Sequence, residues 1–254
     1  MATLKVNFHA SWIDDKSDLV YTNNFQRIIN FYLFQCPNEN VSSSGIDLKS
    51  YGWKNPWKND CLRLYLYSIA TLENDKTLFK AKNYEDVSKG IDQIKIKGKF
   101  YNTSANKVVF YTSQKYPDIL TIIFYIRCAF AHGRFLIKTI DNEVVYFFEA
   151  INPKKESVLK ARLVLKEKTL IDWIDILKNG PNSFNTSYKK YIDEIREFIL
   201  FKINSEQSIL KEILFEKAPY LSALCKRVVN QLLKEKKISC KKNQLFLNKQ
   251  KGLH

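Results

Sequence analysis

An apolar segment near the middle of the chain, PDILTIIFYIRCAFAHG, places the strongest constraint on the fold. Pro117 suits the first turn of a helix, and the carboxylate of Asp118 suits the positive end of the helix dipole. Gly133 is the residue type expected directly after a helix end. The apolar run is too short to cross a bilayer and is followed by Arg127. The segment therefore predicts a helix in the core of a globular domain, with Arg127 and His132 in its last two turns.

The sequence after this helix has the pattern of β-strands. Residues 134–151 read as a β-hairpin with the letters DNE at the turn, and residues 157–167 alternate apolar and basic side chains. A small antiparallel sheet is therefore expected between about residues 135 and 167.

The best candidate for a domain boundary is the segment NGPNSFNTS, in which Gly, Pro, Asn and Ser gather. After it come three segments with helical spacing and then two short apolar runs around a polar turn, which is the order of elements in a winged-helix unit. Residues 226–254 contain nine Lys or Arg and one acidic residue, Glu235. We therefore expect two units, residues 1–181 and a basic, winged-helix-like unit of residues 182–254.

The chain carries a formal net charge of +15, from 41 Lys plus Arg against 26 Asp plus Glu. Such an excess favours polyanionic partners, with nucleic acid ahead of an anionic membrane surface; a lysine-rich composition without functional meaning is the alternative. The five cysteines include no CxxC pair, so neither a zinc site nor a disulfide framework is expected. The opening letters, MATLKVNFHASW, contain no secretory signal. The sequence predicts a cytoplasmic protein with no metal, no cofactor and no membrane association.

Arg127 and His132 each have an ordinary structural explanation. A histidine at a helix end often donates to the last free carbonyl groups, and an arginine on an amphipathic helix often pairs with a neighbouring acid. Together they have a chemical one, because five residues of helix rise by about 7.5 Å, a separation that an arginine side chain can shorten. Histidine exchanges a proton near neutral pH, and arginine keeps a fixed positive charge. The pair suits metal-independent RNA cleavage, with His132 taking the proton of a 2′-hydroxyl and Arg127 stabilising the phosphate.

The stretch IRCAFAHGRF resembles the signature of HEPN domains, in which an arginine is followed after four to six residues by a histidine at the end of an inner helix. The letters FAHGRF and the expected hairpin after them are similar to plasmid- and mobile-element-borne members in particular. The resemblance covers roughly residues 1–180, and its specific part is about ten residues long. It implies a mainly α (α+β) fold, a helical bundle with the strands of about residues 135–167 as an insertion.

The resemblance also implies a homodimer in which two Arg–His pairs form one composite cleft. Many members are metal-independent endoribonucleases of toxin–antitoxin or phage-defence systems, which implies RNA as the substrate and catalytic roles for Arg127 and His132. Cys128 departs from the family, which usually has a polar residue, commonly asparagine, after the arginine. A thiol is a poor substitute for an amide that orients the histidine. A version of the fold that binds RNA without cutting it is therefore the alternative.

Six further residues are candidates for contacts with RNA or phosphate: Cys128, Arg134, Lys226, Arg227, Lys241 and Lys242. Their structural alternative is a solvated, lysine-rich surface. If the C-terminal unit is a winged helix, the helix from about Ser222 is expected to enter a DNA groove. Three functions follow in order. The first is an endoribonuclease, the second a non-catalytic nucleic-acid-binding regulator that dimerises through the HEPN fold, and the third a module that docks an acidic protein such as an antitoxin.

Overall fold

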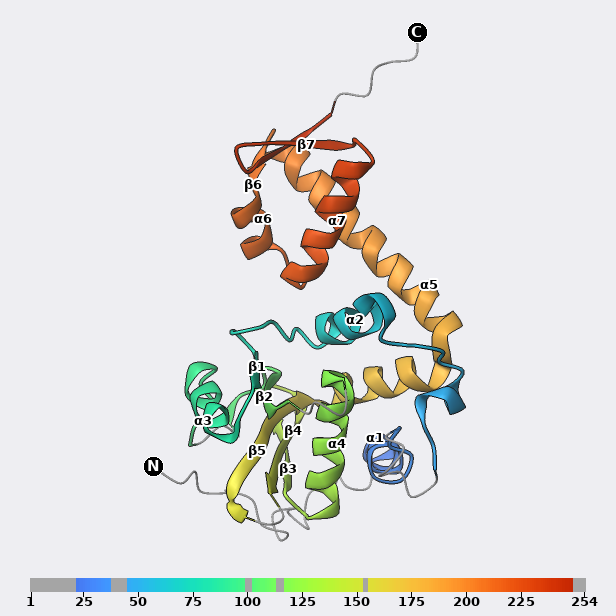
Figure 1. Ribbon diagram of the computed structural model, residues 1–254, viewed down its shortest axis with the longest axis vertical. Helices are drawn as coiled ribbons and strands as arrows, with labels where there is room; N and C mark the ends of the chain where they lie inside the picture. Colours follow the sequence, from blue (N-terminus) through green and yellow to red (C-terminus); the bar gives the residue numbers. More distant parts are fainter. Residues whose placement is uncertain (1–21, 38–44, 99–101, 113–116, 153–154, 249–254) are drawn as a thin grey trace. The chain divides into compact units, whose positions relative to one another are not determined.

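The computed structural model divides the chain into two compact units, Met1–Pro181 (unit 1) and Asn182–His254 (unit 2), each of which is described by itself (Figure 1). The residues described are 22–37, 45–98, 102–112, 117–152 and 155–248. None of the helices in this part of the chain has the length and apolar character that a membrane crossing needs.

A five-stranded sheet forms the centre of unit 1 (Figure 1). The strands are β1 (Leu78–Ala81), β2 (Lys107–Tyr111), β3 (Phe135–Ile140), β4 (Glu143–Asn152) and β5 (Lys155–Lys166). Their order across the sheet is β1-β2-β5-β4-β3. β1 and β2 pair in parallel, whereas the other neighbours pair antiparallel. The sheet is therefore mixed, and its strands come from distant parts of the unit.

The mainly α fold expected from the HEPN resemblance is wrong. Unit 1 has an α/β architecture with a substantial sheet, and residues 135–167 are not an insertion into a helical bundle. Within them, β5 is the central strand and is hydrogen-bonded to β2 on one side and to β4 on the other. The strands that the sequence did not predict are β1 and β2, which have four and five residues. Runs as short as these carry too little of the period of two to be distinguished from loops.

The helix α3 (Tyr84–Gln93) lies in the chain between the parallel strands β1 and β2 and covers one face of the sheet. Asn83 caps its first turn, because the side-chain oxygen accepts a hydrogen bond from the backbone N–H of Asp86 at 2.9 Å. Val87 and Ile91 are fully buried among apolar side chains of β2, β4 and β5. This packing fixes α3 against the sheet.

Gly90 has no room for a side chain. A Cβ atom at this position would lie 2.3 Å from Cδ1 and 2.6 Å from Cγ of Phe79 in β1. Alanine normally stabilises a helix by about 1 kcal/mol relative to glycine. Gly90→Ala is instead expected to lower the free energy of unfolding by about 1–3 kcal/mol, because the ring and the helix must move apart.

Urea denaturation followed by circular dichroism measures this change in unfolding free energy. The double variant Phe79→Leu/Gly90→Ala is the control, because the smaller side chain gives the new methyl group room. A single variant as stable as the wild type would contradict the close packing of α3 on β1.

The helix α4 (Asp118–Ala131) packs on the opposite face of the sheet. Side chains alternate between the two faces along β4, so Tyr146 and Phe148 point away from α3 and toward α4. The ring of Phe130 in α4 lies edge-on to that of Phe148, with centroids 5.1 Å apart, and to that of Phe135, at 4.8 Å. An aromatic cluster therefore holds the C-terminal half of α4 on the sheet.

The bounds of α4 agree with the signals in the sequence. The helix begins after Pro117, and His132 is its C-cap. Gly133 follows with a φ of 62°, a left-handed conformation that glycine adopts without strain. The N–H of Arg134 then donates to the carbonyl of Ala129 at 2.8 Å, as in the hydrogen-bonded helix ends that favour glycine.

Buried hydrogen bonds hold the first half of α5 (Glu167–Ser205) in unit 1. They run from Tyr32 Oη to the Leu170 carbonyl at 3.1 Å, from Trp53 Nε1 to the Leu177 carbonyl at 2.8 Å, and from Trp173 Nε1 to the Leu66 carbonyl at 3.0 Å. The donors Tyr32, Trp53 and Trp173 are large buried aromatic side chains, so packing and hydrogen bonding act together there.

The remaining helices in the described part of unit 1 are α1 (Asn23–Ile29), the π-helix η3 (Asn30–Phe34), the 3-10 helices η4 (Leu48–Tyr51) and η5 (Lys58–Asp60), and α2 (Cys61–Ile69).

The helix α5 is interrupted at Gly180, next to the boundary between the units. Its φ of 75° and ψ of −174° are not helical, and a Cβ atom would lie 2.6 Å from the carbonyl oxygen of Tyr51. Pro181 follows directly. Only glycine satisfies both the backbone conformation and the close approach at this position.

Unit 2 has the element order helix, strand, helix, helix, strand, strand. Its elements are the second half of α5, β6 (Ile209–Leu210), α6 (Lys211–Lys217), α7 (Ser222–Lys234), β7 (Ile238–Lys241) and β8 (Gln244–Leu247). The strands form a sheet in the order β6-β8-β7. Arg196 of α5 pairs with Glu235, which follows the last turn of α7, and its hydrogen bond lowers the pKa of that carboxyl to about 2. The pair therefore stays ionised at neutral pH and connects α5 with α7.

Candidate functional site

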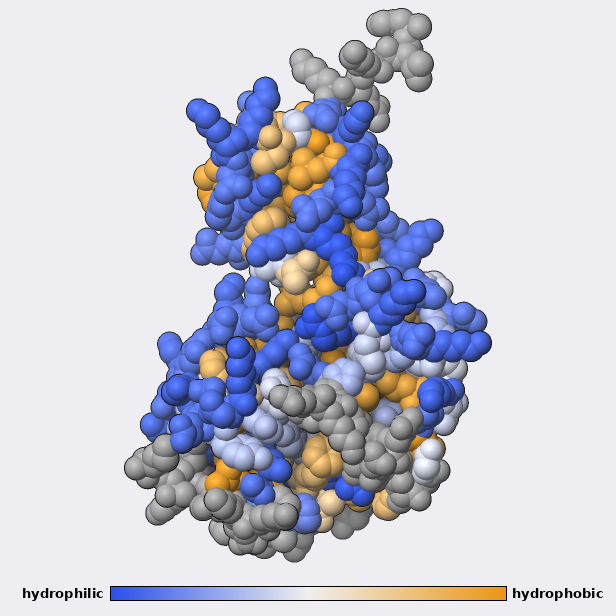
Figure 2. Space-filling view, in the orientation of Figure 1, coloured by the Kyte–Doolittle hydropathy of each residue, from blue (hydrophilic) through white to orange (hydrophobic). Residues whose placement is uncertain are grey.

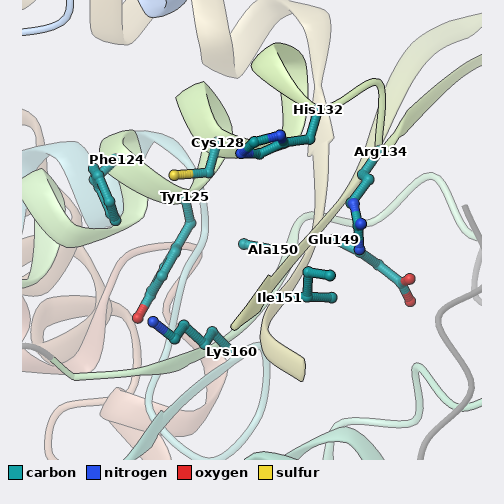
Figure 3. A pocket seen from close by; sticks show the side chains of 9 residues that line it. All are labelled: Phe124, Tyr125, Cys128, His132, Arg134, Glu149, Ala150, Ile151 and Lys160. Atoms are coloured by element: carbon teal, nitrogen blue, oxygen red, sulfur yellow. The ribbon is translucent and has the colours of Figure 1, made fainter. Parts of the chain in front are cut away.

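A cavity of about 350 Å³ lies in unit 1 between α4 and the strands β4 and β5 (Figure 3). It is lined by Phe124, Tyr125, Cys128, His132, Arg134, Glu149, Ala150, Ile151 and Lys160. Four of these residues come from α4 and its C-cap, and the others come from the segment just before β3 and from the paired strands β4 and β5. The cavity therefore lies where the end of the helix meets the sheet.

The helical repeat explains which side chains of α4 reach the cavity. Phe124, Cys128 and His132 are four residues apart, so they form one stripe along the helix. Arg127 is five residues before His132, which places it about 140° further around the helix. Arg127 is not among the lining residues. Within one chain, the structure brings His132, Cys128 and Arg134 together and leaves Arg127 on another side of the helix.

Arg127 is half-buried, and its Nε is buried without a hydrogen-bond partner among the described residues. Its positive charge lies close enough to Cys128 to influence that thiol. Arg127 and His132 therefore do not share this cavity within one chain, and their joint action on one phosphate stays a prediction.

Two groups in the cavity are poor acids. Burial raises the pKa of the Cys128 thiol above its ordinary value, and the charges of Arg127 and Lys160 oppose this only in part. Burial also raises the pKa of Tyr125, whose hydroxyl donates to the Tyr111 carbonyl at 3.0 Å. The thiol is therefore protonated at neutral pH, and the phenol is already committed to a structural hydrogen bond. Neither side chain suits proton transfer or nucleophilic attack.

Glu149 is the one acid among the lining residues, and a buried arginine of the adjacent strand β5, Arg162, neutralises its charge. The side chains of Glu149 and Arg162 are both fully buried, and Arg162 Nε donates to Glu149 Oε1 at 2.8 Å. Arg162 Nη1 also donates to the Ile96 carbonyl at 2.9 Å. The other polar side chains of the cavity are therefore one imidazole and two cations: His132 is exposed, and Arg134 and Lys160 are half-buried.

Lys160 carries no signal in the sequence that would place it in this cavity. Regular alternation would put it on the same face as Val164, which packs in the core on the α3 side. Arg162, which donates to the carbonyl of Ile96 in that core, is on this face as well. The register of β4 with β5 shifts between Ala150 and Ile151. Such an irregularity redirects side chains near it. The Lys160 Nζ lies 5.9 Å from the centroid of the Tyr84 ring at the start of α3, and in Figure 3 it points toward the hydroxyl end of Tyr125.

A second candidate site lies in unit 2, on the exposed face of α7. The face is lined by Ala223, Lys226, Arg227, Asn230, Gln231 and Lys234, whereas Leu224, Cys225, Val228, Val229 and Leu232 are buried on the opposite face. Figure 2 shows hydrophilic side chains (blue) bordering an apolar area (orange) in unit 2 on the side shown. The helix therefore presents amides and positive charges along its whole solvent face.

Contacts orient the basic side chains of this face. Lys226 Nζ lies 5.7 Å from the centroid of the Phe215 ring, and Arg227 Nη1 donates to the Tyr188 hydroxyl at 3.3 Å. The two contacts hold these positive charges against side chains of α6 and α5.

Lys241 and Lys242 lie elsewhere in unit 2, at the turn that joins β7 to β8. Lys242 and Asn243 both have positive φ values, 46° and 66°, as the tight two-residue turns of β-hairpins require. The turn therefore presents two exposed lysines at one end of the small sheet.

No group of three or more His, Cys, Asp or Glu side chains that could hold a metal ion occurs in the described part of the chain. Comparison of the chain with models of protein families, with curated proteins and with solved structures found no match.

Proposed function

We propose that this protein binds nucleic acid and that unit 2 holds duplex DNA. The observation that carries the proposal is the solvent face of α7, where three positive charges and two amides share one side of a helix. The element order and the strand order β6-β8-β7 are those of a winged helix, in which the third helix enters the major groove. On that basis, α7 is the helix that reads the groove.

The side chains have the chemistry that such contacts need. Lysine and arginine neutralise phosphate groups and release counterions, which makes binding strong at low salt and largely independent of sequence. Asn230 carries both a donor and an acceptor, as recognition of base edges requires. Gln231 already donates from Nε2 to Glu235 Oε1 at 2.9 Å, so it keeps one further N–H and its side-chain carbonyl for such a contact. Lys241 and Lys242 at the β7–β8 turn suit contacts with a neighbouring stretch of the backbone.

The test is the salt dependence of DNA binding by the full-length chain, measured by fluorescence anisotropy on a labelled duplex. Three to five phosphate contacts give a slope of about −3 to −4.5 in a plot of log K against log salt concentration. A chain that binds no duplex at low salt would contradict the proposal and leave the docking of an acidic protein, such as an antitoxin, as the use of its positive charge.

Metal-independent RNA cleavage is the second candidate, and one observation favours it. The exposed imidazole of His132 lies at the rim of a cavity whose cationic side chains are Arg134 and Lys160. In this proposal His132 exchanges the proton of the 2′-hydroxyl, and Arg134 or Lys160 stabilises the phosphate. Arg127 takes part only if a second copy of the chain presents it, which is the homodimer that the HEPN resemblance implies.

His132→Ala is expected to reduce RNA cleavage in EDTA by about 10²- to 10⁴-fold, because a general acid–base group contributes that much. The assay follows products with cyclic phosphate ends by gel electrophoresis, and circular dichroism checks that the variant folds. Arg127→Ala separates the two arrangements: a small effect indicates a site within one chain, and an equal loss indicates a shared site. Wild-type protein that leaves RNA intact in EDTA would end this proposal.

A further inference from the structure

The cavity in unit 1 has the charge of an anion-binding site. His132, Arg134 and Lys160 come from three different elements, the end of α4, the segment before β3, and β5. They approach the cavity from different sides (Figure 3). The acid that lines the cavity, Glu149, is bound to Arg162. Nitrogen donors around a partly closed space, with the one carboxylate among the lining residues bound to an arginine, favour a negatively charged ligand.

The rest of the lining is apolar. Phe124 and Tyr125 present their rings to one side of the cavity, and Ala150 and Ile151 lie across from them (Figure 3). The volume of about 350 Å³ is at the small end of the roughly 300–1,000 Å³ that ligand sites of proteins have. Such a site suits a flat, apolar body attached to the charged group.

Main-chain hydrogen bonds hold the backbone of Arg134 in place before any ligand arrives. Its N–H donates to the Ala129 carbonyl at 2.8 Å, and its own carbonyl accepts from the N–H of Glu149 at 3.0 Å. Glu149, the β4 residue that makes this second hydrogen bond, is itself held by its ion pair with Arg162 in β5. Because the backbone at this position is already ordered, binding through the guanidinium costs only the freedom of the side chain.

We propose that this cavity binds a small organic anion, with a phosphate or carboxylate held by Arg134, Lys160 and His132 and a flat ring held against Phe124 and Tyr125. The site is independent of DNA binding by unit 2, and it does not require that His132 cleaves RNA. Unit 1 is, on this inference, a ligand-binding unit in its own right.

Isothermal titration calorimetry of the full-length chain tests the proposal with three matched probes: 1-naphthoate, 1-naphthyl phosphate and the neutral 1-naphthamide. At least one anion is expected to bind with a stoichiometry of one, and the amide about 10-fold or more weaker. The two anions distinguish a carboxylate site from a phosphate site. Lys160→Met and Arg134→Met are each expected to weaken binding of the preferred anion by about 10- to 100-fold, because each removes a charge-assisted hydrogen bond.

Lys138→Met is the control, since Lys138 lies in β3 of the same sheet and does not line the cavity; it should bind the anion as the wild type does. Equal binding of the amide and the anions, or unchanged binding in the Lys160 and Arg134 variants, would overturn the proposal. Binding of inorganic phosphate as tight as that of naphthyl phosphate would overturn the role of the rings.

A chain that cuts RNA through these same residues and binds none of the probes would show that the ligand is RNA. DNA binding by the same variants should not change, so failure here leaves the function of unit 2 untouched.

Discussion

Replacing Arg162 with methionine is expected to lower the free energy of unfolding by about 3–5 kcal/mol, because the Glu149 carboxylate then stays buried without its positive partner. Both side chains have no exposed surface, and Arg162 also donates to the Ile96 carbonyl. Methionine fills most of the volume, so the loss reflects the uncompensated charge rather than a large cavity. Urea denaturation followed by circular dichroism measures the change in unfolding free energy.

The double variant Glu149→Leu/Arg162→Met is the decisive control for this prediction. With both charges gone, stability should return to within about 1–2 kcal/mol of the wild type, or exceed it, because a buried ion pair gains little over apolar side chains of similar volume. Lys168→Met breaks an exposed pair with Asp172 and should cost less than about 1 kcal/mol. A single Arg162→Met variant that loses no more than this surface variant would show that the buried pair does not stabilise the sheet.

Neutralising the basic face of α7 is expected to abolish most of the DNA affinity. For each phosphate contact, the binding constant falls with about the 0.9 power of the salt concentration. At 0.1 M salt, one contact therefore raises the affinity by about 8-fold relative to 1 M salt. The triple variant Lys226→Gln/Arg227→Gln/Lys234→Gln should therefore bind duplex DNA about 10²- to 10³-fold more weakly and lower the salt slope by about three. Anisotropy titrations at several salt concentrations measure both values.

A second triple variant separates a local contact from the effect of net charge. Lys76→Gln/Lys89→Gln/Lys168→Gln removes the same three charges from exposed positions of unit 1. It should reduce affinity by no more than a few-fold and leave the salt slope unchanged. Equal losses in the two triple variants would mean that the overall charge of +15, and not α7, attracts DNA.

Local signals in the sequence were enough to predict α4 and the strands that follow it. Pro117, Asp118 and Gly133 mark the ends of the helix. The letters DNE between two apolar runs indicate the hairpin of β3 and β4, and alternating apolar and basic side chains indicate β5. The class of the fold depended on β1 and β2, whose hydrogen bonds join segments far apart in the chain. No local sequence pattern predicts such pairing. The resemblance to HEPN domains therefore led to the wrong expectation of a mainly α fold.

The candidate site could be predicted only in part, for the same reason. The spacing of Cys128 and His132 places them on one stripe of α4, and the same geometry places Arg127 on another. Lys160 reaches the cavity next to a register shift between β4 and β5. No pattern of residues in the sequence predicts this shift. The buried partner of Glu149 is equally hidden, because its identity depends on the register of two strands.

The position of β5 in the sheet has a consequence for synthesis on the ribosome. β2 and β4 each need β5 as a neighbour, yet β5 emerges after both of them. Until then β2 and β4 each carry an open edge that the finished sheet covers, and open edges are where incompletely folded proteins associate with one another. The arrival of residues 155–166 closes both edges in a single step. Translation pauses before this segment should therefore make the growing chain depend on chaperones, and pauses after it should not.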